Sequence, residues 1–400
     1  MDNFGNYLVS SFLQSPILNP QSSPSSLYFH EVSTVTTTFP VKSSKQPQPV
    51  NIIAEDVNRM FATILQRLHN GTLSYSEEET RNGTVMRLGY GVSVLTYLKP
   101  TQRVLFNTLR DANPFFHLFE SLWMLAGRND LAPLLHYVSS FDKYSDNGVT
   151  LNGAYGYRWR NVNLFEYEEE LDADILQEVD QLEIIAAHLK RDPQSRRAVL
   201  QMWNVQDDLM KIENSKDVCC NLCAVFEVQA NKFLNMTVYN RSNDLIWGAL
   251  GANAVHFSFL QEYLAHRIGV QVGIYSQVSS NLHIYKGLWD TKASKYLNRT
   301  TMHDYSYNMV SKVIPLVQDT KRFDEEVCAF VENQDYHCKE RFLSVVAQPM
   351  CLAFRHHKER DYARALEAVS YIQADDWRHA AFNWITKREQ SWVERNERTE

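Results

Sequence analysis

The sequence predicts an α+β fold, in which strands are interleaved with buried helices. Two patterns indicate this class. Apolar stretches with helical spacing lie between short runs rich in β-branched and aromatic residues, and the order of the two is mixed. The chain is 400 residues long and has no internal repeat, so it can bury a sizeable core as one large domain or two smaller ones.

Four helices are expected from apolar residues spaced three and four apart. In the second helix, Asn113 suits the N-cap and Pro114 the first helical position. Glu120 lies inside the apolar run of this helix. Glycines that follow the first and fourth helices are expected to end them. The expected helices start at Ile53, Asn113, Glu178 and Ala254, and end near Asn70, Gly127, Lys190 and Ile268.

Strand-like runs lie between these helices. The second and third runs are separated by Ala230-Asn231-Lys232 and are expected to pair as a hairpin. From Lys286 onward the chain is expected to be helical and polar, with a charged tail. The expected strands span residues 198–203, 223–229, 234–239 and 272–278.

The composition divides the chain into three parts. Residues 1–50 are rich in Ser, Pro, Gln and Thr, so they can bury little and are expected to form a low-complexity extension. A targeting or partner-binding arm is the alternative for this segment. Residues 51–290 are expected to form the main domain. Residues 291–400 are expected to be a helical extension, to which the sequence assigns no role.

The composition also argues against several classes of protein. A net charge of −7 disfavours a general nucleic-acid binder, although local arginines can still bind small anions. No apolar stretch approaches the ~20 residues that span a bilayer, and the N-terminus lacks a secretory pattern. Six cysteines, with Cys219 and Cys220 adjacent, are typical of reduced thiols in a cytoplasmic protein. Cys220 and Cys223 have the spacing of zinc ligands, but no second ligand pair follows at regular spacing.

Three short segments carry groups that suit nucleophilic and phosphate chemistry. Cys220 precedes a predicted strand and would be a nucleophile if nearby cations lowered its pKa, although a lone Cys is more often structural. Arg241 and Ser242 follow the predicted hairpin and can bind phosphate, or form an ordinary surface turn. The pair Arg196-Arg197 suits a dianionic phosphate, and its alternative is a solvated basic corner.

Taken together and in this order, these segments resemble the thymidylate synthase and deoxypyrimidine hydroxymethylase superfamily. The resemblance runs from about Arg81 to Tyr285, roughly half of the chain. It implies a large mixed sheet packed by buried helices, with one sheet face forming the interface of a homodimer. The similar segments are Arg81-Asn82-Gly83-Thr84, Glu120-Ser121-Leu122-Trp123, residues 155–160, Ser195-Arg196-Arg197, the segment around Cys220, residues 241–244 and His283-Ile284-Tyr285.

The resemblance implies a reaction. The substrate would be a pyrimidine deoxynucleoside monophosphate and the co-substrate 5,10-methylenetetrahydrofolate, with no metal, membrane or nucleic acid involved. Cys220 would add to C6 of the base and make C5 nucleophilic. Glu120 would relay protons through water, and Tyr155 would assist removal of the C5 proton.

The resemblance also implies binding residues. The nucleotide phosphate would be held by arginines and a hydroxyl, two of the arginines coming from a partner subunit. The sugar would be held by a histidine and a tyrosine. The phosphate residues would be Arg81, Arg241 and Ser242, with Arg196 and Arg197 from the partner, and the sugar residues would be His283 and Tyr285.

Base and folate would be read by other positions. Asn253, whose amide can both donate and accept, suits uracil, although one extra residue separates it from Asp244. Asp244 would contact the folate pterin. Phe141 replaces the tryptophan that flanks the folate-derived intermediate in synthases, and Asn221 replaces a histidine that orders water near the base.

Departures from the synthase pattern bear on the product. Besides Asn221 and Phe141, the charged residues 394–400 differ from the small apolar residues that close the site in synthases. A site that admits water favours a hydroxymethyl over a methyl product. We therefore expect 5-hydroxymethyl-dUMP, with thymidylate formation and dCMP hydroxymethylation as alternatives.

Two other classes of function fit the residues less well. A non-catalytic nucleotide- or RNA-binding module would not need Cys220, Glu120 and Tyr155 together. A cysteine hydrolase would pair Cys220 with His283, but no glycine-rich oxyanion segment surrounds the cysteine.

Overall fold

The computed structural model describes residues 48–106, 110–168, 173–293 and 306–397. Apart from residues 48–50, the expected N-terminal extension lies outside the described residues. No helix within these ranges is long and apolar enough to cross a membrane.

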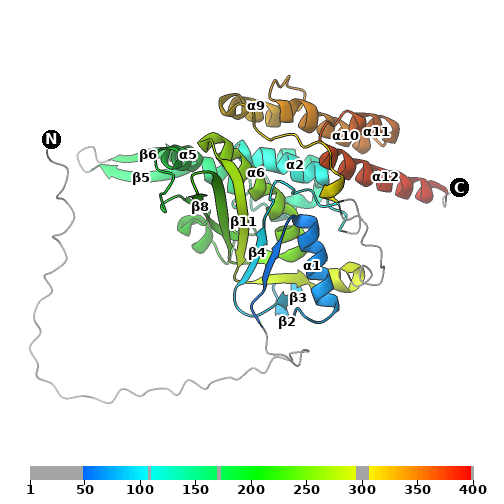
Figure 1. Ribbon diagram of the computed structural model, residues 1–400, viewed down its shortest axis with the longest axis horizontal. Helices are drawn as coiled ribbons and strands as arrows, with labels where there is room; N and C mark the ends of the chain where they lie inside the picture. The colour runs from blue at the N-terminus through cyan, green and yellow to red at the C-terminus, as the bar shows by residue number, and fades with distance from the viewer. Residues whose placement is uncertain (1–47, 107–109, 169–172, 294–305, 398–400) are drawn as a thin grey trace, which may run out of the picture. The chain divides into compact units, whose positions relative to one another are not determined.

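A six-stranded mixed sheet forms the centre of the fold, as the resemblance implies (Figure 1). Its strand order is β1-β4-β11-β9-β8-β7. β1 runs parallel to β4 and β9 parallel to β11, and the other neighbours are antiparallel. The strands are β1 (Asn51–Ala54), β4 (Ser93–Tyr97), β7 (Val199–Gln201), β8 (Asn221–Gln229), β9 (Phe233–Asn240) and β11 (Gln271–Ser279).

A smaller sheet has the order β10-β12-β3-β2. None of its strands was expected from the sequence, since β2 is strongly acidic and β10 and β12 are very short. A separate hairpin, β5 and β6, was also not expected. These strands are β2 (Tyr75–Thr80), β3 (Gly83–Leu88), β10 (Asn243–Asp244), β12 (Leu282–Tyr285), β5 (Val162–Glu168) and β6 (Ala173–Val179).

Two apolar helices lie behind one face of the main sheet. α6 (Asn253–Ile268) packs on β9 and β11, and α2 (Pro114–Leu125) packs on α6. The side chain of Asn113 caps α2 by accepting hydrogen bonds from two backbone N–H groups at 3.1 Å. Gly269 ends α6 in the left-handed region, with φ of 90°. Both predicted helices are therefore confirmed, and both are buried on nearly all sides.

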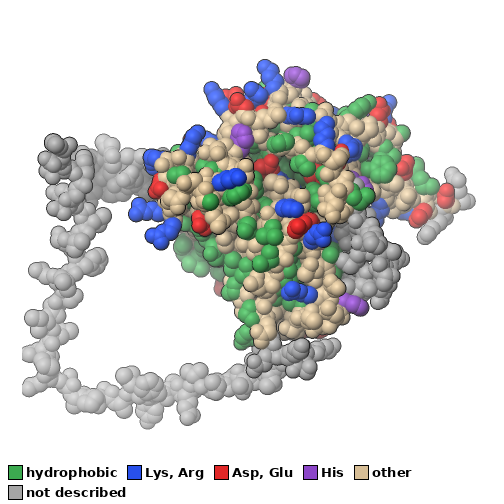
Figure 2. Space-filling view, in the orientation of Figure 1, with side chains coloured by type: hydrophobic (Ala, Val, Ile, Leu, Met, Phe, Trp, Pro, Cys, Tyr) green, Lys and Arg blue, Asp and Glu red, His purple; other side chains and the backbone are tan. Residues whose placement is uncertain are grey.

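The opposite face of the main sheet is uncovered among the described residues. Side chains alternate along each strand, so Leu234 points toward α6 while Tyr239 points the other way. Ile53, Val199, Tyr239 and Ile274 are 62%, 45%, 39% and 37% exposed. Figure 2 shows hydrophobic side chains among polar ones over these strands. The sheet therefore presents an uncovered face that carries apolar side chains.

The predicted start of the first helix is wrong. Residues 51–54 form β1, and α1 (Val57–His69) begins only after its N-cap Asp56. Ile53 fits a helical stripe in the sequence, but its backbone pairs with Thr96 of β4 and its side chain is exposed. Pairing with a strand distant in sequence overrides the local pattern.

Other boundaries shift in the same way. α5 (Gln181–Arg191) starts later than predicted, because residues 173–179 pair with β5. The strand predicted over residues 198–203 is reduced to β7. The β8–β9 hairpin is confirmed, and Ala230 and Asn231 in its turn have φ of 53° and 55°, as tight hairpin turns require.

The C-terminal part is helical as predicted, but it is not polar throughout. α9, α10 and α12 pack against α2, and α11 packs against α10 and α12 (Figure 1). They bury apolar side chains such as Phe323, Phe354 and Ile385, because each helix turns one face toward the core. These helices are α9 (Thr320–Glu332), α10 (Gln348–Lys358), α11 (Tyr362–Ser370) and α12 (Asp375–Glu397).

Short helical segments complete the fold. They are α3 (Ala132–Tyr137), α4 (Tyr155–Arg160), α7 (Lys286–Leu288), the 3₁₀ segments η1 (Ser139–Tyr144) and η5 (Tyr307–Met309), and the π-helical segments η2 (Val205–Leu209), η3 (Leu245–Ala252), η4 (Trp289–Ala293) and η6 (Leu343–Ala347).

Replacing Leu260, a fully buried residue of α6, with Ala should lower the free energy of unfolding by about 2–5 kcal/mol, because the vacated core volume loses its contacts. Ile184→Ala on α5, where the side chain is 57% exposed, should change it by less than about 0.5 kcal/mol. Urea denaturation followed by circular dichroism measures both. Equal losses in the two variants would contradict the placement of α6 in the core.

Candidate active site

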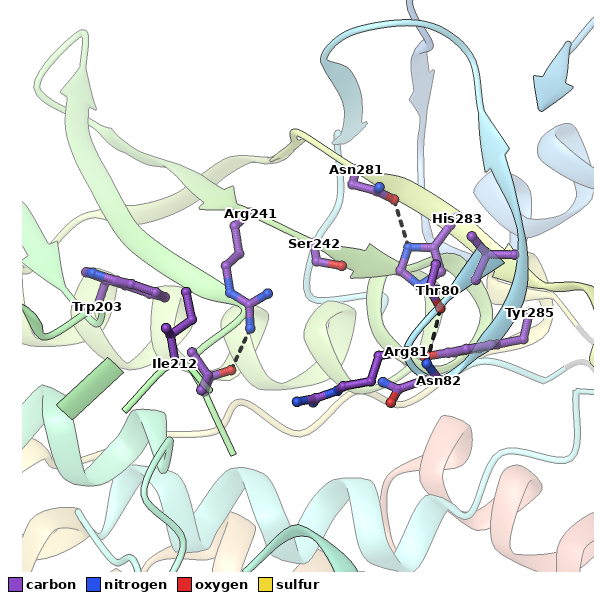
Figure 3. Close-up of a pocket in the computed structure, with 12 residues that line it drawn as sticks. Thr80, Arg81, Asn82, Trp203, Ile212, Arg241, Ser242, Asn281, His283 and Tyr285 are labelled. Atoms are coloured by element: carbon purple, nitrogen blue, oxygen red, sulfur yellow. Dashed lines mark hydrogen bonds between the residues drawn. The ribbon is translucent and has the colours of Figure 1, made fainter. Parts of the chain in front are cut away.

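The site begins with a pocket of about 310 Å³ beside the two sheets. Arg241 and Ser242 follow β9 and form part of its wall, and His283 and Tyr285 come from β12. Arg81, in the turn between β2 and β3, points toward the same space as Arg241 (Figure 3). Five predicted substrate-binding residues therefore line one pocket.

Strand pairing explains how distant segments meet here. Asp244 of β10 lies opposite His283 of β12, which in turn lies opposite Arg87 of β3. The β2–β3 turn, which carries Arg81, is thereby held beside the end of β9. Nδ1 of His283 lies 3.0 Å from Oδ1 of Asn281, which fixes the ring at the pocket wall.

Arg241 connects the pocket to the predicted nucleophile. Its guanidinium donates hydrogen bonds to the carbonyl oxygens of Val218 and Cys219, at 2.9 and 2.7 Å. Its backbone N–H donates to the carbonyl oxygen of Cys220 at 2.9 Å. One side chain therefore lines the pocket and holds the segment that carries the thiol.

Cys220 stands directly before β8, next to Tyr155 at the start of α4. The backbone N–H of Cys220 donates to the Tyr155 hydroxyl at 3.2 Å. Burial raises the pKa of the Cys220 thiol, and the charge of Arg241 opposes that rise. The lowered pKa expected for a nucleophile is therefore not found here, because loss of solvent outweighs the nearby cation.

A buried ion pair that the sequence did not single out holds the same region. Asp208 is fully buried, and it accepts hydrogen bonds from the Arg158 guanidinium and from the Cys219 N–H, the latter at 3.1 Å. Arg158 also donates to the carbonyl oxygen of Met202 at 2.7 Å. Arg158 lies inside segment 155–160, which resembles the family, and this position could have singled it out in the sequence.

Glu120 faces a histidine that sequence reasoning missed. Its Oε2 atom lies 3.0 Å from Nε2 of His256 on α6, and both side chains are largely buried. The ring of His117, one turn before Glu120, is edge-on to that of His256, with centroids 6.4 Å apart. Burial lowers the pKa of His117, as do the charges of Arg110 and His256. His256 could have been singled out in the sequence because it lies three residues after Asn253, near the start of the same predicted helix.

The extra residue before Asn253 is absorbed by η3. A π-helical turn takes more residues than an α-helical turn, and Gly251 within it has non-helical angles, φ −122° and ψ −107°. Asn253 therefore still begins α6. Its amide nitrogen donates to Oδ1 of Asn243 at 3.1 Å.

Two predicted residues leave buried polar atoms unpaired among the described residues. One oxygen of Asp244 accepts from the backbone N–H of Trp247, but the other, Oδ2, has no partner. Burial raises the pKa of the Asp244 carboxyl group. The amide nitrogen of buried Asn221 also has no partner. Such groups are rare in folded proteins, so both suit contact with a bound molecule.

Phe141 of η1 packs edge-on against Phe116, with centroids 5.4 Å apart.

Arg196 and Arg197 do not line this pocket. Both are exposed in the loop between α5 and β7, and neither side chain makes a hydrogen bond or ion pair within the described part of the chain. Their contact with a partner subunit stays a prediction.

Comparison with known proteins decides the family. The chain matches the family described as thymidylate synthase over residues 60–344. This chain belongs to the thymidylate synthase family. The match extends beyond the stretch from Arg81 to Tyr285 in which the resemblance was found, and it includes most of α1 and all of α9.

Individual relatives within this family carry two names. A deoxyuridylate hydroxymethyltransferase of Pseudomonas phage M6 is 40% identical over 332 residues, which cover 80% of this chain and 90% of the relative. A deoxyuridylate hydroxymethyltransferase of Bacillus phage SP01 is 36% identical over 226 residues, 56% of each chain. A thymidylate synthase of Buchnera aphidicola (subsp. Acyrthosiphon pisum, strain Tuc7) is 28% identical over 169 residues, 42% of this chain and 58% of the relative.

Arg158→Met should lower the free energy of unfolding by about 3–5 kcal/mol, because it leaves the Asp208 carboxylate buried without its cation. The double variant Arg158→Met with Asp208→Asn should recover much of that loss, since Asn keeps an acceptor but carries no charge. Chemical denaturation at constant pH gives all the values. A double variant no more stable than the single one would show that the buried charge is not the cause.

Proposed function

We propose that the chain transfers a one-carbon unit from 5,10-methylenetetrahydrofolate to C5 of dUMP and forms 5-hydroxymethyl-dUMP. The observation that carries the proposal is the position of Arg241. Its side chain lines the pocket and also donates hydrogen bonds to the backbone carbonyl groups just before Cys220. The relatives named deoxyuridylate hydroxymethyltransferase support this substrate and product. Residues 51–290 would form the catalytic domain, acting in the cytoplasm, where Cys219 and Cys220 stay reduced.

The pocket would hold the nucleotide by its phosphate and sugar. Arg81 and Arg241 would bind the phosphate through charge-assisted hydrogen bonds, and Ser242 would add a hydroxyl donor. His283 and Tyr285 would contact the sugar from β12. Because Arg241 also holds the carbonyl groups beside the thiol, a phosphate bound there would be in fixed register with the nucleophile.

Cys220 would add through its sulfur to C6 of the uracil ring. The addition breaks the C5–C6 double bond and shifts electron density to C5, which becomes nucleophilic. Because burial raises the pKa of the thiol, proton loss depends on the opposing charge of Arg241. Tyr155, whose hydroxyl contacts the Cys220 N–H, would assist removal of the C5 proton in the later step.

Asp244 and Phe141 fit a bound folate. The unpaired Oδ2 of Asp244 can accept an N–H of the pterin, and Phe141 offers an aromatic edge and face. When bound, methylenetetrahydrofolate would supply the one-carbon unit. Asp244 and Phe141 would orient it toward C5 of the base.

Glu120 and His256 would direct water to the carbon carried on C5. The Glu120 carboxylate, 3.0 Å from the His256 imidazole, can take a proton from water while the histidine holds the carboxylate in place. Asn221, with its unpaired amide nitrogen, offers a second polar group for ordering that water. Transfer of hydride in place of water would give thymidylate, and the more distant thymidylate synthase relative makes this the second candidate.

The enzyme would act as a homodimer. The uncovered face of the main sheet exposes Ile53, Tyr239 and Ile274, and a second copy would bury them. Arg196 and Arg197 precede the edge strand β7, and within the described ranges their side chains make no hydrogen bond or ion pair, so they would be free to reach the partner's phosphate site.

Cys220→Ser should lower kcat by about a thousand-fold or more, because a hydroxyl adds poorly to C6. Binding of dUMP, followed by calorimetry, should stay near the wild-type value. Cys223→Ser, on the uncovered face of β8, is the matched control and should keep its turnover. Full activity in Cys220→Ser would end the proposal.

Mass spectrometry of the wild-type products separates the candidates. Incubation with methylenetetrahydrofolate and either dUMP or dCMP should give 5-hydroxymethyl-dUMP and tetrahydrofolate from dUMP. Thymidylate with dihydrofolate would establish the second candidate instead.

Mixing inactive subunits tests the shared site. Cys220→Ser subunits and Arg197→Ala subunits should each be nearly inactive alone. After mixing and subunit exchange, about a quarter of wild-type activity should appear, because half of the dimers are hybrids with one intact site each. If Arg197 acts within its own subunit, the mixture will show no more activity than its parts.

A further inference from the structure

Two buried amides stand behind Asn253, and neither was singled out by the sequence. Gln277 of β11 is 0% exposed and Asn243 of β10 is 3% exposed. Buried amides of this kind need all their hydrogen bonds satisfied, and here they satisfy one another in series. We refer to Gln277 and Asn243 as the amide relay.

The carbonyl oxygen of Ala249, at one end of the relay, determines the direction of each hydrogen bond between the relay amides. The carbonyl oxygen of Ala249 can only accept, so the group that Gln277 turns toward it, at 2.8 Å, must be its NH₂. The oxygen of Gln277 therefore faces Asn243, and it accepts from the Asn243 amide nitrogen at 3.0 Å. That nitrogen also lies 3.1 Å from the hydroxyl of Ser279.

The relay ends at the residue proposed to read the base. With its nitrogen turned toward Gln277, Asn243 presents Oδ1 to Asn253, and it accepts from the Asn253 amide nitrogen at 3.1 Å. Gly248 leaves the room for this contact, since a Cβ there would fall 2.8 Å from that Oδ1. Asn253 is thus held with one N–H used, and with its oxygen and second N–H in fixed places.

The orientation of this amide decides which pyrimidine it fits. Uracil presents a donor at N3 and an acceptor at O4, whereas cytosine presents an acceptor at N3 and a donor at N4. An asparagine amide pairs with either edge if it is free to turn over, because its oxygen and nitrogen simply exchange places. An amide that cannot turn over pairs with one edge only.

We propose that the amide relay, Gln277 and Asn243, locks Asn253 in one orientation and thereby selects uracil over cytosine nucleotides. The inference rests on the proposed function, in which Asn253 reads the base. Turning Asn253 over would set its oxygen against that of Asn243. Turning all three amides would set the oxygen of Gln277 against the Ala249 carbonyl, so a cytosine substrate meets an unpaired buried group in either case.

Gln277→Met tests the relay, because Met fills similar space without an amide. Asn243 could then turn over, with the Ser279 hydroxyl donating to its oxygen, and Asn253 could follow. The ratio of kcat/KM for dUMP to that for dCMP, measured with both substrates in one mixture, should fall by roughly 10- to 100-fold. Most of the change should come from better use of dCMP.

Gln261→Met is the matched control. Gln261 is also a fully buried glutamine, and its amide donates to the backbone carbonyls of Leu234 and Ile274 at 2.8 and 3.0 Å. The control loses a comparable buried amide outside the relay, so the substrate ratio should stay at the wild-type value. If both variants lose selectivity equally, general loosening explains the effect and the proposal fails.

A second variant covers the case in which Gln277→Met does not fold. Tyr97→Phe removes the hydroxyl that lies 3.3 Å from the Gln277 amide nitrogen and that donates to the Ala249 carbonyl at 2.9 Å. It should lower the ratio in the same direction by a smaller factor. If Gln277→Met or Tyr97→Phe folds, is active and keeps the wild-type ratio of kcat/KM for dUMP to that for dCMP, the proposal is wrong.

Binding of dUMP and dCMP without folate is measured in parallel, so that the two proposals fail separately. If the wild type binds dUMP selectively but forms no product, the proposed reaction fails and the relay is judged on the binding ratio. If the wild type forms product and the relay variants keep its selectivity, only the relay fails.

Discussion

A buried ion pair holds the proposed nucleophile in place. Arg158 and Asp208 are both inside the protein, where either charge alone would be costly. Their hydrogen bonds join α4, the backbone after β7 and the N–H of Cys219. The segment before β8 therefore cannot shift without breaking the pair. The position of Cys220 beside Arg241 and Tyr155 depends on this constraint.

Several buried polar groups of the core are paired across two elements. Glu120 on α2 meets His256 on α6, and Gln277 on β11 meets Asn243 on β10. In a medium of low dielectric constant, such pairs are strong when complete and costly when broken, so they specify one arrangement.

The C-terminal helices contribute by covering α2. Phe354 of α10 packs against Phe115, with ring centroids 5.4 Å apart, and Trp384 of α12 packs against the same ring. Arg388 of α12 also binds Asp111, just before α2, at 2.7 Å. With α6 on one side and these helices on another, α2 is buried nearly all round. That burial encloses most of the Glu120 side chain, whose Oε2 atom lies 3.0 Å from Nε2 of His256.

The sequence by itself determined the family, the type of chemistry and the pocket residues such as Arg81, Arg241 and His283, because motifs depend only on residue type and order. The tertiary structure alone decided that Ile53 lies in a strand, that burial raises the pKa of Cys220, and which way the Asn253 amide faces. Each of these depends on contacts between segments far apart in the chain. Burial and the direction of hydrogen bonds exist only once the chain has folded, so no local pattern contains them.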